Sequence, residues 1–105
     1  MFAILIALQV AVANPTSALF PLSKPNVRIA AILKDGDGKT ESTAYKVKSV
    51  DEEYEILRLF GLRPGMQSLI IGKDQKPYDR LDATNPRSGE QVTLWFDISS
   101  VPSLF

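Results

Sequence analysis

The sequence predicts an α+β fold: a small single domain in which one helix packs on a mostly antiparallel sheet. Three observations support this prediction. A capped helical pattern occupies about residues 50–60, residues 90–99 alternate with period two, and short β-prone runs lie between turns rich in Gly and Pro. The predicted order of elements is β-α-β-β-β, after an N-terminal signal segment.

The predicted helix has recognisable start and stop signals. It follows residues 44–49, where polar and apolar side chains alternate as in a half-buried strand. Ser49 and Glu52 have the spacing of a capping box, in which the hydroxyl accepts from the Glu52 amide and the carboxylate accepts from the Ser49 amide. Gly61 suits the C′ position. The side chains expected to face inward are Val50, Tyr54, Ile56, Leu57 and Phe60.

Three further segments complete the expected sheet. Residues 62–65 are predicted to form a turn, and residues 67–71 a short strand. Residues 77–84 are predicted as a strand. Pro77 is compatible with this prediction, because it stands at the start of the strand, where proline is tolerated. Residues 85–89 are predicted as a hairpin loop that leads into the last strand.

The last strand defines the candidate binding surface. Val92, Leu94, Phe96 and Ile98 alternate with Thr93, Trp95 and Asp97, so the only tryptophan points away from the apolar face. An aromatic pair with charged neighbours on that outer face is typical of a partner surface. The predicted binding residues are Tyr78, Arg80, Asp82, Trp95 and Asp97. The alternative is a second packing layer, covered by the N-terminal segment.

The N-terminal residues 1–13 are almost wholly apolar, carry no charged side chain and end in small residues. This pattern is typical of a secretory signal peptide, although the first basic residue is Lys24. We expect cleavage after Ala13 or Ala18 and an exported protein, periplasmic or secreted. A buried N-terminal element and an uncleaved anchor are the alternatives, but the apolar run is shorter than the roughly 20 residues that a membrane span needs.

The expected domain organisation has three parts. Residues 1–18 are the signal peptide, residues 19–34 a Pro-rich lead-in with a short apolar element, and residues 35–105 the α+β module. The apolar stretch 27–33 fits either a strand or the end of a helix. Residues 35–38, Asp-Gly-Asp-Gly, are predicted to form a turn.

Composition excludes several classes of function. The chain has no histidine and no cysteine, which excludes Ser-His-Asp triads, cysteine nucleophiles and the usual structural zinc sites. Twelve basic and twelve acidic side chains are intermixed, so no basic patch indicates a nucleic-acid partner. A calcium loop beginning at Asp35 would place Lys39 and Lys46 where acidic ligands are required. We therefore expect no cofactor, no metal and no catalytic residue.

Two other functions compete with a binding module. A small hydrolase would use paired carboxylates among Asp79, Asp82, Asp97 and Glu90, but strand alternation places Asp79 and Asp82 on opposite faces. A structural remnant without a ligand of its own would expose an apolar patch. We favour a non-enzymatic module that binds a protein or cell-envelope partner, with no transmembrane span after signal cleavage.

Five blocks along residues 35–99 resemble, in order and spacing, the C-terminal module of a bacterial family of exported proteins known only as a domain of unknown function. The blocks are residues 36–49, 53–62, 67–69, 78–79 and 88–99. The resemblance implies bacterial export, an α+β module and no established catalytic residues. In that family the module follows a longer α-helical region, which this sequence lacks, so the chain is expected to be a short relative or a fragment.

Overall fold

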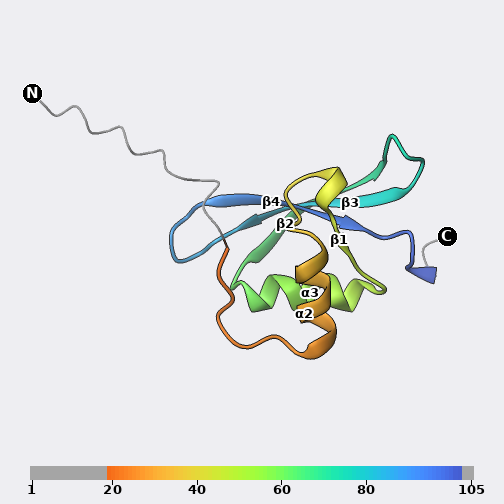
Figure 1. Ribbon diagram of the computed structural model, residues 1–105. Coiled ribbons are helices and arrows are strands. Elements are labelled where there is room, and N and C mark those ends of the chain that lie inside the picture. Colours follow the sequence, from red (N-terminus) through yellow and green to blue (C-terminus); the bar gives the residue numbers. More distant parts are fainter. Residues whose placement is uncertain (1–18, 103–105) are drawn as a thin grey trace, which may run out of the picture.

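The computed structural model describes residues 19–102 and shows two helices on one side of a four-stranded mixed sheet (Figure 1). The α+β prediction is therefore confirmed. The expected signal segment, residues 1–18, lies outside the described residues. The elements in chain order are α2 (Val27–Asp35), η1 (Glu41–Thr43), β1 (Tyr45–Lys46), α3 (Val50–Leu59), β2 (Arg63–Ile71), β3 (Pro77–Thr84) and β4 (Gln91–Asp97).

The strands lie in the order β1-β4-β3-β2. The β2–β3 and β3–β4 pairs are antiparallel, as predicted, whereas β1 pairs with β4 in parallel, with Tyr45 opposite Phe96. The first strand is also shorter than the predicted residues 44–49. Its partner lies about fifty residues away in the sequence, so local alternation could not indicate its length or direction.

The termini of α3 follow the predicted start and stop signals. The Ser49 hydroxyl accepts a hydrogen bond of 3.2 Å from the Glu52 amide. The second half of the capping box was wrong, because the Glu52 carboxylate accepts from the Lys48 amide instead, at 2.7 Å. At the other end Gly61 has φ +67°, and the Leu62 amide donates to the Leu57 carbonyl at 2.9 Å. The positive φ of Gly61 and the bond from Leu62 to Leu57 are those of a Schellman motif, which ends the helix.

The buried face of α3 differs from the prediction. Val50 is 38% exposed, whereas Glu52 and Glu53 are buried. The buried stripe runs through residues 53, 56, 57 and 60, the spacing of one helix face. It packs against Leu81, Leu94 and Phe96 of the sheet. Leu94 and Phe96 confirm the predicted apolar face of β4, and together with Leu81 of β3 they place the core between the sheet and the helices.

The apolar stretch 27–33 is helical and belongs to the folded unit. Asn26 caps α2, because its side-chain oxygen accepts from the Ile29 amide at 2.8 Å. Ile29 and Ile32 are buried in the core, so α2 is the second helix on this side of the sheet. The preceding lead-in is tied to α3 by a hydrogen bond from the Leu22 amide to the Leu59 carbonyl. Within residues 19–102, neither helix has the length and hydropathy of a membrane span.

Strand β2 begins earlier than predicted and forms an edge of the sheet. The expected turn at 62–65 is wrong, since Arg63 and Pro64 already pair with Thr84 and Ala83 of β3. The register shifts between Pro64 and Gln67 and then runs without interruption to Ile71. This bulge explains why a segment with a Pro-Gly pair still belongs to a strand.

Candidate functional site

The antiparallel pairing of β3 and β4 brings all five predicted binding residues to one face of the sheet. Tyr78 lies opposite Asp97, and Arg80 lies opposite Trp95. Asp82 is next along the same face and lies opposite Thr93. Since α2 and α3 cover the other face, we call this side, with Tyr78, Arg80, Asp82, Trp95 and Asp97, the outer face (Figure 1).

One half of the outer face is accessible to solvent. Trp95 is half-buried, and the guanidinium carbon of Arg80 lies 5.8 Å from the centre of its ring, within the range of a cation–π contact. Asp82 is also half-buried and accepts a hydrogen bond of 2.9 Å from the Thr93 hydroxyl. Arg80, Asp82 and Trp95 therefore present a cation, an anion and an aromatic ring together.

The other half of the outer face is buried. Tyr78 and Asp97 are 4% and 6% exposed. The Tyr78 ring packs edge-on against Trp95, with ring centres 6.3 Å apart, and its hydroxyl donates to Asp74 at 2.6 Å. This hydrogen bond raises the pKa of Tyr78 and lowers the pKa of Asp74. These contacts give Tyr78 the role of a support beneath Trp95 rather than of a ligand-binding group.

Asp97 also has internal partners. One of its carboxylate oxygens accepts from the Ser99 amide at 2.9 Å and from the Ser99 hydroxyl at 2.6 Å. The other oxygen lies 3.9 Å from the Lys76 ammonium nitrogen. Because its hydrogen-bonding capacity is used within the domain, Asp97 orders the chain after β4.

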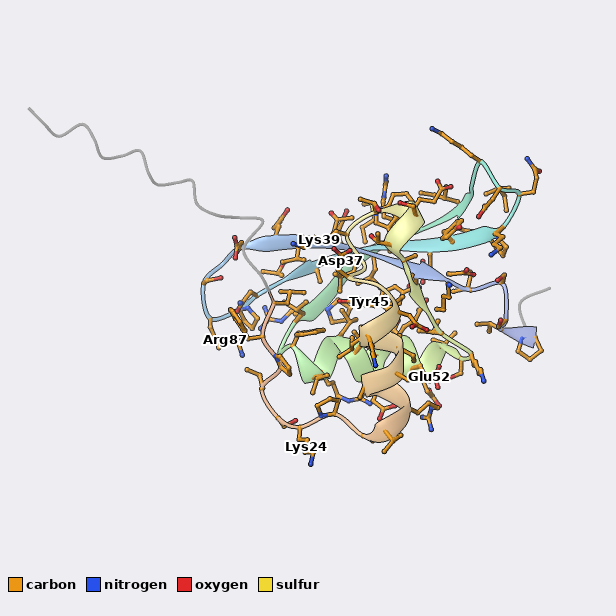
Figure 2. The ribbon with its side chains drawn as sticks, viewed as in Figure 1. Lys24, Asp37, Lys39, Tyr45, Glu52 and Arg87 are labelled. Carbon is orange, nitrogen blue, oxygen red and sulfur yellow. The ribbon has the colours of Figure 1, made fainter. Side chains whose placement is uncertain are left out.

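Among the described residues, the loop that contains η1 lies against the buried half, and the expected N-terminal segment up to residue 18 lies outside the described residues. The Lys73 amide donates to the Glu41 carboxylate at 3.1 Å, which links η1 to the β2–β3 turn. Glu41 also lies near the phenol of Tyr78 and contributes to its raised pKa. The Trp95 amide donates to the Gly38 carbonyl at 2.7 Å, so residues 37–39 of this loop run beside β4, and Figure 2 labels Asp37 and Lys39 there.

The carboxylates of the alternative hydrolase do not form a pair on the outer face. Asp82 lies opposite Thr93, and Asp97 stands four residues further along β4, a distance of about 13 Å in a strand. The carboxyl groups of glycosidases lie within about 10 Å of each other. Asp79 points to the helix-covered face, as alternation predicted relative to Asp82, and is buried.

Sequence reasoning missed a buried acidic pair beneath α3. Glu53 is 1% exposed, and neither of its carboxyl oxygens has a hydrogen-bond partner among the described residues. Burial, and to a smaller extent the neighbouring Asp79 carboxylate, raises the pKa of Glu53 to about 8. Asp79 accepts a hydrogen bond from the side-chain amide of Gln67. The pair is enclosed by the core, so it is a structural feature and not an accessible acid–base site.

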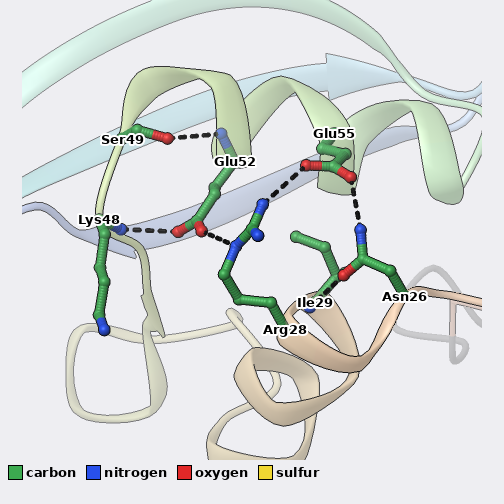
Figure 3. A network of polar contacts seen from close by, with 7 residues as sticks. All are labelled: Asn26, Arg28, Ile29, Lys48, Ser49, Glu52 and Glu55. Carbon is green, nitrogen blue, oxygen red and sulfur yellow. Dashed lines mark hydrogen bonds and ion pairs between the residues drawn. The ribbon is translucent and has the colours of Figure 1, made fainter.

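A second missed group links the two helices (Figure 3). Arg28 of α2 forms an ion pair with the buried Glu52 of α3. Its guanidinium also has a nitrogen 3.7 Å from a carboxylate oxygen of Glu55 in the same helix. Asn26 adds a hydrogen bond of 2.9 Å to Glu55. The Ser49–Glu52 spacing was the available sequence pattern for this group. The Glu52 carboxylate binds the Lys48 amide at the start of α3 and also forms the ion pair with Arg28.

The fold and the outer face define a small α+β module with two helices on one side of its sheet and an exposed aromatic–arginine contact on the other. A family model described as a domain of unknown function (DUF4919) matches residues 22–103. The chain belongs to this family, as the resemblance of its sequence blocks to a family of unknown function indicated. No curated protein and no solved structure matches the chain.

Proposed function

We propose that the protein is an exported bacterial module that binds a protein or a cell-envelope component through Arg80, Asp82 and Trp95. The observation that carries this proposal is the partly exposed Trp95 with the Arg80 guanidinium against its ring. Trp and Arg are enriched among the residues that dominate binding energies, and a preformed pair loses little side-chain freedom on binding.

Support for a binding role rather than catalysis comes from the arrangement of charges. The accessible half of the outer face holds one cation and one anion beside an aromatic ring, which suits hydrogen-bonding and stacking partners. Buried Tyr78 holds Trp95 from below. The surface is thus rigid where it would contact a partner, a property that reduces the entropic cost of association.

Export is proposed from residues 1–13 alone. The test is the intact mass of protein recovered from the periplasm or medium of an expressing bacterium. A chain that starts at Asn14 or Leu19 would support export. A full-length chain found only in the cytosol would contradict it and would assign residues 1–13 to another role.

Binding can be measured without a label because Trp95 is the only tryptophan. Tryptophan fluorescence of the full chain would be followed during titration with solubilised peptidoglycan fragments and, separately, with envelope proteins obtained by affinity capture. We expect a saturable change for a true partner. Arg80→Ala should weaken binding about tenfold or more, as truncation of an interface anchor does.

Arg63→Ala is the matched control, because Arg63 is an exposed arginine on the edge strand β2 and lies outside the proposed surface. Equal losses for Arg80→Ala and Arg63→Ala would indicate unspecific charge attraction and contradict the proposed surface. Circular dichroism would show that both variants keep the fold.

A further inference from the structure

Strand β2 presents an unusually open edge. It has nine residues and, within the described residues 19–102, pairs only with β3, whereas the opposite edge strand β1 has two. Alternate N–H and C=O groups of an edge strand point outward and are free to pair with another strand. Most residues of β2 are exposed. The edge therefore offers main-chain hydrogen bonds to a further strand.

The regular part of this edge is symmetric about Leu69. The register irregularity between Pro64 and Gln67 interrupts one end, and the turn that begins at Gly72 closes the other. Between them residues 67–71 pair continuously with β3. A second β2 that ran antiparallel about a two-fold axis at Leu69 would use all five regular residues of both strands, with Gln67 opposite Ile71 of the copy.

The side chains at this edge are apolar on the helix-covered face. Leu69 is 64% exposed and Ile71 is 58% exposed, although both lie on the same face as the buried Asp79. In an antiparallel pair the two-fold axis is perpendicular to the sheet, so directly opposite residues point to the same side. Leu69 and Ile71 of both copies would thus form one apolar cluster on the helix-covered side of the joined sheet.

Charge favours a second copy of this chain as the partner strand. Residues 67–71 carry no charged side chain, so self-pairing places no like charges opposite each other. The nearest charged side chains, Arg63 and Lys73, lie beyond the register irregularity and in the following turn, so they stand outside the paired segment.

We propose that β2 pairs antiparallel with β2 of a second copy about Leu69, which joins two four-stranded sheets into one. The interface consists of main-chain hydrogen bonds along residues 67–71 and of the apolar contacts of Leu69 and Ile71. It is isologous, as expected for a two-fold dimer.

The dimer would double the proposed binding surface. Because both outer faces point to the same side, the two Trp95 rings would lie about 25 Å apart, given a strand spacing of about 4.8 Å. A partner with repeated binding sites would then engage both surfaces at once. The pairing itself is independent of the proposed function, since no outer-face residue takes part in it.

The absence of cysteine from the sequence allows a direct test of the register. In the full chain, Leu69→Cys places two thiols opposite each other across the axis, within the reach of a disulfide. We expect mild oxidation to give a covalent dimer. Met66→Cys is the control. Met66 is 72% exposed, but in the proposed register residue 66 of one chain would lie about 20 Å from residue 66 of the other. Cross-linking of Met66→Cys in place of Leu69→Cys would overturn the register.

Analytical ultracentrifugation of the full chain measures reversible dimerisation without an engineered disulfide. Leu69→Lys should raise the dimer dissociation constant about tenfold or more, because a charge at the axis would face its own copy. Met66→Lys introduces the same charge outside the regular stretch and should have a much smaller effect. A wild-type chain that stays monomeric at high micromolar concentration, with no Leu69→Cys cross-link, would overturn the proposal, as would equal effects of both lysine variants.

Discussion

Glu53 is the residue whose environment departs most from that of a free side chain. Its carboxyl group is enclosed between α3 and the sheet, near Asp79, and its pKa is raised to about 8. At neutral pH the folded protein therefore keeps a proton on Glu53 that the unfolded chain releases. Through linkage, this difference makes the free energy of unfolding depend on pH.

Stability should fall as the pH rises from about 4.5 to about 8, because the folded state binds the extra proton throughout this window. Glu53→Gln removes the titrating group but keeps its shape. We expect the variant to be more stable than wild type at pH 9, by on the order of 4–5 kcal/mol, and nearly equal to it at pH 4. Urea unfolding between pH 4 and pH 9 measures both values.

Asp51→Asn provides the control for this experiment, since Asp51 is an exposed acid in the same turn of α3. Its stability should keep the pH dependence of wild type. A Glu53→Gln variant with an unchanged pH dependence would show that Glu53 is not protonated in the folded state at neutral pH.

Residue-level prediction from sequence succeeded where the determinant is local. The Ser49 cap and the Gly61 stop depend on backbone bonds within a few residues, so they could be identified directly. The burial of Glu53 depends on what packs above it, and acidic side chains in a first helical turn are usually solvated. Its spacing from Ile56 and Leu57 was the available signal, because these three positions share one helix face.

At the scale of elements, α2 and α3 are joined by the ion pair between Arg28 and the buried Glu52 (Figure 3). Among the described residues, Arg28→Ala would leave the buried Glu52 carboxylate with only the hydrogen bond from the Lys48 amide. Since the Arg28 side chain is 59% exposed, solvent weakens the pair, and we expect a loss of about 1–2 kcal/mol. Urea denaturation measures this loss.

Arg28→Lys keeps the charge but not the forked guanidinium geometry, so it should recover part of the lost stability. A variant Arg28→Ala as stable as wild type would show that the two helices are held together by Ile29 and its apolar neighbours alone.

The link between α3 and β2 depends on the conformation of Gly61. Its φ of +67° is strained for other residues, and an added Cβ would lie 2.6 Å from Leu22 and close to Arg87. Figure 2 shows Arg87 beside this end of α3, where its guanidinium donates to the Phe60 carbonyl at 3.2 Å. Gly61→Ala should therefore destabilise the domain by about 2–3 kcal/mol, measured by thermal unfolding.

Gly89→Ala separates the two contributions. Gly89 also has a positive φ, +76°, but nothing lies within 4 Å of an added Cβ. This variant should lose only about 1 kcal/mol, the cost of the backbone conformation. Equal losses at both positions would mean that crowding by Leu22 and Arg87 contributes nothing.

The helices and strands that depend on residues close in the sequence were predicted best. The strand at 77–84 and the helix near 50–60 agree closely with the structure, as does the hairpin loop after Asn85. The stretch 27–33 was too short for its period to distinguish helix from strand, and only its burial against α3 decides. The early start of β2 was hidden by Pro64, because sequence rules treat a Pro-Gly pair as a turn unless a bulge accommodates it.

At the scale of the whole molecule, the sheet separates two environments. One face carries the helices and the buried acids, and the other carries the arginine–tryptophan contact. Alternation along β4 predicted the division between faces, and it placed the five candidate residues together. It could not predict that the η1 loop would bury Tyr78 and Asp97, because that contact joins segments about thirty residues apart.

The parallel pairing of β1 with β4 also constrains the order in which the chain can fold. A strand at residues 45–46 has no neighbour in the sheet until residues 96–97 have been synthesised. The hairpins of β2, β3 and β4 close over short loops, whereas this last pairing spans most of the domain and pays a larger loop-closure entropy. During translation the strand before α3 must therefore wait for the end of the domain before it can join the sheet.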